Sequence, residues 1–344
     1  MSTTQSVTTS PDRNGLTWRA LSVADLDRWI ALVEKMEVHD RAEERTRRSD
    51  LEVLTRQSWV DLEADSRVAV DVDGEFRAVG RNMFRLGAID TVAVALTGGV
   101  DPDWRGRGIG RELLAWQRKR AVANIADLRA VDAHAARLPA RIGGFVEEQV
   151  TNRARLFEAA GFEVTRWFLQ LRRRLTDVPH VGDLPIDGLR VERFDDRYAE
   201  RLRLAHNDAF RDHWGSATYD EEAWRTGLLE EEAFRPAQSF VIVDANDPDE
   251  PIVAYVVNCE YEHDWAPQGF TDGYTDVIGV RRAWRGCGLA RYLLALSAEA
   301  FAEAGHSYAT LDADAENPSG AVALYESVGY RPTHRTKYYS IDVD

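Results

Sequence analysis

The stretch WRGCGLARYLLAL, residues 284–296, places an arginine and two glycines directly before a leucine-rich segment with helical spacing. The first backbone N–H groups of such a helix have no partners inside it, and the helix dipole makes that end positive. Glycines lack the Cβ atoms that would keep an anion away from those groups. Taken alone, the stretch fits a phosphate-binding loop and a tight strand-to-helix turn equally well.

The same pattern occurs a second time, 180 residues earlier, as WRGRGIGRELLAW. LFEAAGF (156–162) likewise matches LYESVGY (324–330), and LTWRALSVADLDRWIALV near the start matches LRVERFDDRYAERLRLAH from residue 189. Three matching blocks in the same order predict that the chain is two copies of one domain. The matched loop residues are Arg105 and Arg285, Gly108 and Gly288, and Gly110 and Ala290.

The boundary between the copies is predicted at residues 178–187. This linker would join an N-terminal domain, residues 1–177, to a C-terminal domain, residues 188–344. The surrounding segment TDVPHVGDLPIDG contains prolines and glycines and shows no hydrophobic periodicity, as expected for an exposed connection.

Each copy alternates apolar strand-like segments with amphipathic helices. Turn-prone residues inside the apolar stretches 67–86 and 239–262 predict hairpins. The predicted fold class is α/β (α+β), with two domains that each have a mixed, mostly antiparallel central sheet flanked by helices. Further strands are expected at 91–100, 164–173, 273–280, 308–314 and 336–344, and helices at 24–37, 110–123, 197–210 and 290–304.

The composition of the chain excludes some classes of partner and location. The net charge of −15 argues against nucleic acid and is compatible with cationic substrates such as amines. No apolar run approaches the roughly 20 residues of a membrane helix, the start of the chain lacks the apolar region of a signal peptide, and two cysteines are too few for a disulfide framework. We therefore expect a cytoplasmic protein, a monomer or homodimer, with no membrane partner. No residue pattern has firm metal-ligand spacing, so no metal is expected.

Strand, Arg-x-x-Gly-x-Gly/Ala loop and helix, followed by ENPSGAVALYESVGY (316–330), resemble the GCN5-related N-acetyltransferase (GNAT) superfamily. The resemblance covers both halves, so the chain looks like a tandem GNAT. It implies that acetyl-CoA is the cosubstrate, that the loop amides hold its pyrophosphate, and that the preceding strand pairs with its pantetheine arm. The implied cofactor-binding residues are Ile278, Gly279, Val280, Arg285, Gly286, Cys287, Gly288, Leu289, Ala290 and Asn317 in the second copy, and Val100, Arg105, Gly106, Arg107, Gly108, Ile109 and Gly110 in the first.

Acetyl transfer needs a proton for the departing CoA thiolate, and a tyrosine hydroxyl can supply it. Tyr325 occupies the position of this general acid in the family; the competing interpretation is an aromatic that packs the short helix. The first copy has Phe157 there, which cannot give a proton. It also has Gln149 opposite Asn317 and Arg153 opposite Ala321. The N-terminal copy is therefore predicted to be degenerate, a CoA-binding or structural half, and the C-terminal copy to be catalytic.

The general base is predicted on the strand before the second loop. DGYTDVIGV (272–280) offers two aspartates and no glutamate, and we expect Asp276 to be the base. Period-two alternation predicts that Asp276 shares a face with Tyr274, Ile278 and Val280. A charged residue at the solvent-exposed end of a strand is the competing interpretation.

The segment AFRDHWGSATYDEEAW, residues 209–224, lies where GNATs shape the acceptor pocket. Asp212, His213 and Trp214 are predicted to recognise the substrate amine; a helix end anchored by a tryptophan is the competing interpretation. The predicted function is transfer of an acetyl group to a primary amine of a small molecule by direct attack. The layout is also similar to mycothiol synthases, which implies a cysteinyl amine as an alternative acceptor. A non-enzymatic acyl-CoA-binding protein is the other alternative.

Overall fold

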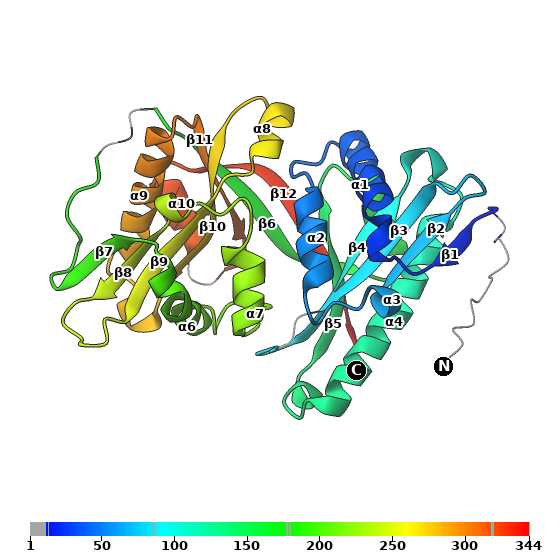
Figure 1. The fold of residues 1–344 in the computed structure, drawn as a ribbon, viewed down its shortest axis with the longest axis horizontal. Helices are drawn as coiled ribbons and strands as arrows, with labels where there is room; N and C mark the ends of the chain where they lie inside the picture. Colours follow the sequence, from blue (N-terminus) through cyan, green and yellow to red (C-terminus); the bar gives the residue numbers. More distant parts are fainter. Residues whose placement is uncertain are drawn as a thin grey trace.

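The computed structural model describes residues 12, 14–84, 87–176, 178, 180–317 and 320–343, which form two lobes side by side (Figure 1). The N-terminal lobe contains β1 (Thr17–Arg19), α1 (Leu26–Asp40), α2 (Arg48–Arg56), α3 (Leu62–Asp65), β2 (Ser66–Val70), β3 (Phe76–Phe84), β4 (Val92–Val100), α4 (Ile109–Val131), β5 (Ala140–Glu147), α5 (Thr151–Ala159) and β6 (Glu163–Arg174). The C-terminal lobe contains β7 (Leu189–Arg193), α6 (Ala199–Ala209), α7 (Glu221–Trp224), β8 (Phe240–Asp244), β9 (Ile252–Cys259), α8 (Glu262–Gln268), β10 (Asp272–Val280), α9 (Leu289–Glu303), β11 (Tyr308–Asp314), α10 (Ala321–Ser327) and β12 (Arg331–Val343).

The predicted fold class is confirmed, with a mixed and mostly antiparallel sheet flanked by helices. The predicted hairpins form as β2–β3 and β8–β9, both antiparallel. In the described chain the parallel pairs are β4 with β5 and β10 with β11, one in each lobe. Helix α4 runs eight residues beyond the predicted end at residue 123, because Asn124, Ile125 and Leu128 continue its buried face.

The two lobes exchange their last strands. Strand β12, from the end of the chain, pairs antiparallel with β5 of the N-terminal lobe, and β6 pairs antiparallel with β11 of the C-terminal lobe. The two exchanged strands also pair with each other, which joins the lobes into one sheet of twelve strands. Its order is β1-β2-β3-β4-β5-β12-β6-β11-β10-β9-β8-β7. The two strands cross the middle of the molecule in Figure 1.

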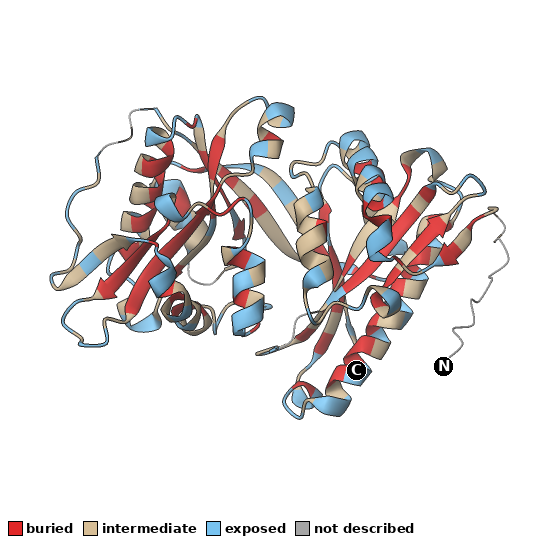
Figure 2. Cartoon of the chain, in the orientation of Figure 1, coloured by how far each residue is buried: buried red, intermediate tan, exposed pale blue. Residues whose placement is uncertain are grey.

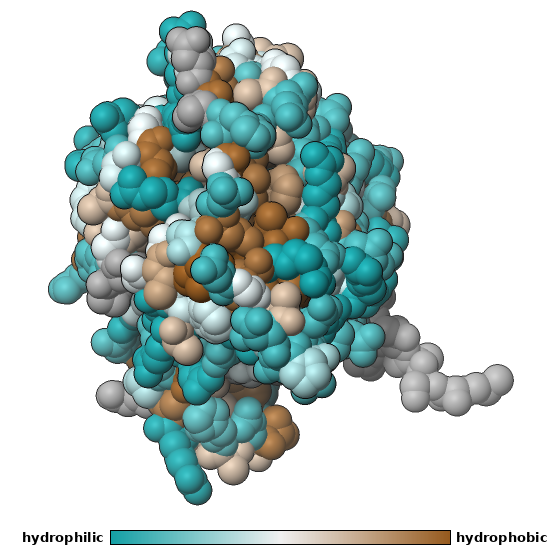
Figure 3. Space-filling model, turned by 90° about the vertical axis from the view of Figure 1, so that its left-hand side faces the viewer, coloured by the Kyte–Doolittle hydropathy of each residue, from teal (hydrophilic) through white to brown (hydrophobic). Residues whose placement is uncertain are grey.

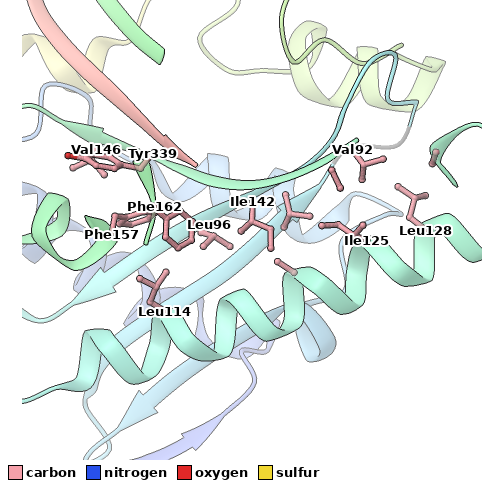
Figure 4. Packing of buried hydrophobic residues seen from close by; sticks show 14 residues of the cluster. Val92, Leu96, Leu114, Ile125, Leu128, Ile142, Val146, Phe157, Phe162 and Tyr339 are labelled. Carbon is pink, nitrogen blue, oxygen red and sulfur yellow. The ribbon is translucent and has the colours of Figure 1, made fainter. Parts of the chain in front are cut away.

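Buried residues follow the central strands and the helix faces against them (Figure 2). In the N-terminal lobe, Leu114 and Ile125 of α4 pack towards Leu96 and Ile142 of the sheet, and Phe157 closes one end of the cluster (Figure 4). The C-terminal lobe has an apolar cluster on each sheet face: α6 and α7 cover one, and α9 and α10 cover the other. The glycine loops lie between β4 and α4 in the N-terminal lobe and between β10 and α9 in the C-terminal lobe.

The predicted linker runs between β6 and β7. Leu184 and Ile186 from this segment pack beside Leu289 and Leu293 of α9. Figure 3 shows this end of the molecule, where an apolar patch lies within a largely hydrophilic surface. The domain limits themselves stay a prediction, because the strand exchange joins the two lobes in one sheet.

Candidate active site

The two glycine loops have the same backbone conformation. Gly106 and Gly286 both have φ of 78°, and Gly108 and Gly288 have φ of 84° and 87°. These positive values favour glycine over residues that carry a Cβ. The backbone N–H groups of residues 106–111 and 286–291 donate no hydrogen bond to any described residue, so both loops present unpaired donors at a helix start. Cys287 lies exposed in the second loop.

The leading arginine of each loop braces the loop. Arg105 Nε donates to the Val100 carbonyl at 3.1 Å, and Arg285 Nε donates to the Val280 carbonyl at 3.2 Å. Arg105 also forms a two-bond ion pair with Asp40, at 2.6 and 2.7 Å, while Arg285 donates to the Ala209 carbonyl at 2.7 Å. Both side chains therefore have protein partners, and the backbone amides remain the donors open to an anion.

Beside each loop the two parallel strands separate, and we call the gap between them the seam of that lobe. Strands β4 and β5 pair only as far as Ala95 opposite Gly143, and β10 and β11 only as far as Thr275 opposite Leu311. Beyond those pairs, one edge of β4 and one edge of β10 lack a neighbouring strand, and the glycine loop follows. Such an edge can form backbone hydrogen bonds to an extended ligand.

The residues at the mouth of the seam differ between the lobes. In the C-terminal lobe the first residues beyond the β10–β11 pairing are Asp276 and Asp312, whereas beyond the β4–β5 pairing of the N-terminal lobe they are Leu96 and Gly144. A Cβ at Gly144 would lie 2.9 Å from the Leu96 carbonyl oxygen and 3.0 Å from the Phe157 ring. The strands β4 and β5 thus place no carboxylate at the mouth of the N-terminal seam, and β5 has no room for a side chain at Gly144.

Arg153 occupies the N-terminal seam. Its Nη2 donates to the Leu96 carbonyl at 3.3 Å, which uses a backbone acceptor on the open edge of β4. Its guanidinium carbon also lies 5.7 Å from the centre of the Phe157 ring. The matching residue of the C-terminal lobe is Ala321, whose methyl group cannot reach across the seam. A pantetheine arm would therefore have to displace Arg153 in one lobe and nothing equivalent in the other.

Tyr325 lies on the α9 side of the C-terminal seam. It packs in the cluster that contains Leu294 and Leu311, and its side chain is 8% exposed. Burial raises the pKa of Tyr325 to about 12, so its hydroxyl keeps its proton at neutral pH. No hydrogen bond joins that hydroxyl to the residues that the structure describes. Asn317, the other residue implied on this side, lies in the turn that follows β11 and forms hydrogen bonds there.

The predicted orientation of Ile278 and Val280 is wrong. Asp272, Tyr274 and Asp276 face the same cavity, but Ile278 and Val280 pack with α9 on the opposite face of the sheet. The cause is a β-bulge in the pairing of β10 with β9, between Thr275 and Val277, which inserts one extra residue and reverses the alternation. The bulge leaves Asp276 exposed at the mouth of the seam, on the face opposite Tyr325.

A cavity of about 1160 Å³ lies in front of Asp276 and extends between the lobes. Its C-terminal end is lined by Asp264, Asp272, Tyr274, Asp276 and Asp312. Its other end reaches the glycine loop and seam of the N-terminal lobe. The lobes meet here through backbone contacts: Arg45 N–H donates to Asp264 at 2.9 Å, and the Arg45 carbonyl lies 2.5 Å from His263 Nε2.

The carboxylates at this end hold protons more tightly than usual. The side chains of Asp312 and Glu44 are exposed within the cavity. Enclosure by the surrounding protein, with the charge of Asp276, raises the pKa of Asp312 to about 6. Enclosure, followed by the charge of Asp312, raises the pKa of Glu44 to about 8. Burial also raises the pKa of Asp264. Carboxyl groups that repel each other in this way favour a cationic ligand, because an ammonium group would relieve the repulsion.

The predicted acceptor residues lie elsewhere. Asp212 forms an ion pair with Arg282, just before the second glycine loop, and lies 3.7 Å from Arg285. His213 Nδ1 lies 3.3 Å from the Trp214 carbonyl. Trp214 packs edge-on against Tyr338 of β12 and under Arg166 of β6, so it anchors its segment to the exchanged strands. None of the three lines the cavity that Asp276 faces.

The sequence interpretation missed Asp312 and Glu44. Asp312 could have been found from YATLDAD, where the alternation places it on the polar face of the strand with Thr310 and Asp314, opposite an apolar face. Glu44 gave no signal, because it belongs to the N-terminal half and reaches the site only through the packing of the lobes. Within the described ranges, no group of three or more His, Cys, Asp or Glu side chains could hold a metal ion, and no helix is long and apolar enough to cross a membrane.

Comparison with known proteins agrees with this geometry. Residues 199–330 match the family model described as "Acetyltransferase (GNAT) family". The mycothiol acetyltransferase of Kocuria rhizophila is 31% identical over 59% of this chain and 67% of its own length, and that of Thermobifida fusca is 30% identical over 67% and 69%. A tandem GNAT protein from the clavulanic acid biosynthesis pathway superposes with a TM-score of 0.64 at 16% identity, covering 95% of this chain and 98% of its own.

Proposed function

Because this chain belongs to the acetyltransferase (GNAT) family, with two lobes of that fold in tandem, we propose that its C-terminal lobe acetylates a primary amine of a small molecule. The observation that supports this most is the C-terminal seam. It opens between two carboxylates on one face and a buried, protonated tyrosine on the other, beside a loop of unpaired amides. The N-terminal seam has none of these side chains.

Bound acetyl-CoA would supply the acetyl thioester. Its pyrophosphate would rest on the amides of residues 286–290, and its pantetheine arm would lie along the open edge of β10. In this arrangement the thioester reaches the mouth of the seam, where β10 and β11 separate. The amine would approach from the cavity, on the face of Asp276.

Asp276 would accept the proton of the incoming ammonium group, directly or through water, and so release the lone pair that attacks the thioester carbonyl. Asp312, on the same face, raises the basicity of the pair because the two negative charges repel each other. Tyr325 would donate its hydroxyl proton to the CoA sulfur as the carbon–sulfur bond breaks. The attacking nitrogen still carries an extra proton in the tetrahedral intermediate; this proton would return to the Tyr325 oxygen, directly or through water, and Asp276 would release its proton to solvent. The products are an acetamide, free CoA thiol and one proton.

A cysteinyl amine is the second candidate acceptor. The relatives named mycothiol acetyltransferases, at 30% and 31% identity, favour it. The cavity supports either acceptor, since both present an ammonium group to carboxylates. The glutamate that the resemblance to mycothiol synthases implies on the strand before the glycine loop is replaced here by Tyr274 or is missing.

Release of CoA thiol from acetyl-CoA, measured with a panel of primary amines and a cysteinyl-sugar conjugate, tests the proposal. We expect turnover with at least one acceptor and an acetamide product by mass spectrometry. Turnover only with the cysteinyl conjugate would select the second candidate. If neither the panel nor the conjugate gave turnover while acetyl-CoA bound to the protein, the chain would be an acyl-CoA-binding protein and the proposal would fail.

A further inference from the structure

The N-terminal lobe contains a buried arginine that no carboxylate neutralises. Arg81 lies on β3 and is 7% exposed. No acidic side chain of the described residues lies within ion-pair distance of it. Its Nη2 contacts the Met83 sulfur at 2.8 Å, and its Nε is buried without any hydrogen bond. Burial lowers the pKa of Arg81 to about 10, with no opposing effect from a nearby charge, and the group stays protonated at neutral pH.

The side chain of Arg81 lines the cavity on the side of α1 and α2. Neighbouring Gly80 faces α4, where a Cβ would come within 2.7 Å of Leu113, so Arg81 projects from the opposite face. Its guanidinium carbon lies 5.9 Å from the centre of the Trp29 ring. The lining on this side includes the apolar residues Trp29, Val33, Met36, Leu51, Leu54 and Val79. The carboxylates of Glu37, Asp40 and Asp50 also line the cavity, and they have partners in Thr46, Arg105 and Arg47.

The fold does not require a cation at this position. Ala78 pairs with Val100 in the N-terminal lobe as Ala254 pairs with Val280 in the C-terminal lobe, which places Arg81 opposite Val257 in the repeat. Val257 is fully buried in an apolar cluster. A buried charge without a partner destabilises a protein, and the valine at the matching position of the C-terminal lobe avoids that cost. The guanidinium is thus best explained by a partner that comes from solution.

We propose that the N-terminal lobe binds a carboxylate with an apolar body in this cavity, its carboxylate paired with Arg81 and its body against Trp29, Met36 and Leu51. The site lies outside the C-terminal seam and does not depend on acetyl transfer. A planar carboxylate can take two donors from a guanidinium, including the Nε that has no partner. The apolar lining selects an aryl or alkyl carboxylate over a small hydrophilic one.

Calorimetry with phenylbutyrate and its neutral analogue phenylbutyramide tests the site on the full chain. The carboxylate should bind at least about tenfold more tightly than the amide, because only the carboxylate neutralises Arg81. The variant Arg81→Met should lose this preference. It should also melt at the same or a higher temperature, because it removes a buried unpaired charge.

Equal binding of both probes, or no binding of phenylbutyrate to the wild type, would overturn the proposal. So would a preference that survives in Arg81→Met, or an Arg81-dependent affinity for inorganic phosphate without one for phenylbutyrate. Should Arg81→Met fail to fold, Arg81→Lys provides the second variant. It keeps the charge but not the paired donors, and it should weaken phenylbutyrate binding while leaving phenylbutyramide unchanged.

Discussion

The seams of the two lobes follow the same strand order but differ in a β-bulge, which β10 has at Asp276 and β4 lacks, and in four side chains. Both follow a parallel pair that stops at matching residues, and both end in a glycine loop with nearly the same φ values. The C-terminal seam has Asp276, Asp312, Tyr325 and Ala321 where the N-terminal seam has Leu96, Gly144, Phe157 and Arg153. A loop that can hold an anion therefore says little about catalysis. The chemistry depends on the few residues where the strands separate.

The largest expected effect is that of Tyr325→Phe, which gives the C-terminal lobe the phenylalanine that the N-terminal lobe has at the matching position. We expect kcat to fall by about 10² to 10⁴, the range for loss of a general acid, with little change in melting temperature because Phe157 packs well at the equivalent position. CoA-thiol release measures the effect. Phe157→Tyr is the matched control and should leave turnover unchanged. A Tyr325→Phe variant with wild-type turnover would show that Tyr325 only packs.

Asp276→Asn should lower kcat/KM by about 10², because the amine would reach the thioester still protonated. The loss should shrink as the pH rises, since more of the amine is then neutral without help from a base. Initial rates across a pH series measure this. Asp212→Asn, on an aspartate outside the cavity, is the control. A loss that is equal at every pH would assign Asp276 to binding rather than to proton transfer.

Gly288→Ala and Gly108→Ala distinguish the contribution of each loop to stability from its contribution to acetyl-CoA binding. Both glycines have φ near 85°, so each alanine should cost about 1–2 kcal/mol of unfolding free energy. Only Gly288→Ala should also weaken acetyl-CoA binding and raise its KM. Denaturant unfolding and steady-state kinetics of the two variants test this prediction. A KM for acetyl-CoA that rises as much in Gly108→Ala as in Gly288→Ala would contradict it.

Arg153→Ala should open the N-terminal seam. We expect the wild type to bind one acetyl-CoA per chain, in the C-terminal lobe, and the variant to gain a second and weaker site, because the Leu96 carbonyl becomes available. Calorimetric stoichiometry measures this. Two equal sites in the wild type would contradict the division between the lobes.

The smallest effect concerns Glu44. A carboxyl group whose pKa is higher in the folded state loses stability as the pH rises from its ordinary value of 4.5 to its folded value of about 8. Glu44→Gln removes that loss, so it should raise the melting temperature at pH 8 and change it little at pH 4. Glu63→Gln, on an exposed glutamate, is the control. A stabilisation that does not vary with pH would show that charge repulsion is not its cause.

Much of the fold could be read from the residues. The repeat, the two loops and the hairpins depend on local patterns, namely glycine spacing, alternation and turn residues, and these survive folding unchanged. The predicted orientation of Ile278 and Val280 was wrong because the bulge between Thr275 and Val277 has no distinctive residue type. The predicted acceptor residues lie outside the cavity, since Trp214 found aromatic and cationic partners on strands far away in the chain.

The sequence by itself determined that the chain holds two copies of one domain, that both copies keep the Arg-x-x-Gly-x-Gly/Ala loop, and that only one keeps the tyrosine. Only the tertiary structure decided that β6 and β12 change places, and that Glu44 of one lobe faces Asp312 of the other. The physical reason is that strand pairing through backbone hydrogen bonds depends little on the side chains. Either closing strand satisfies either open edge, and the packing of the whole molecule selects between them.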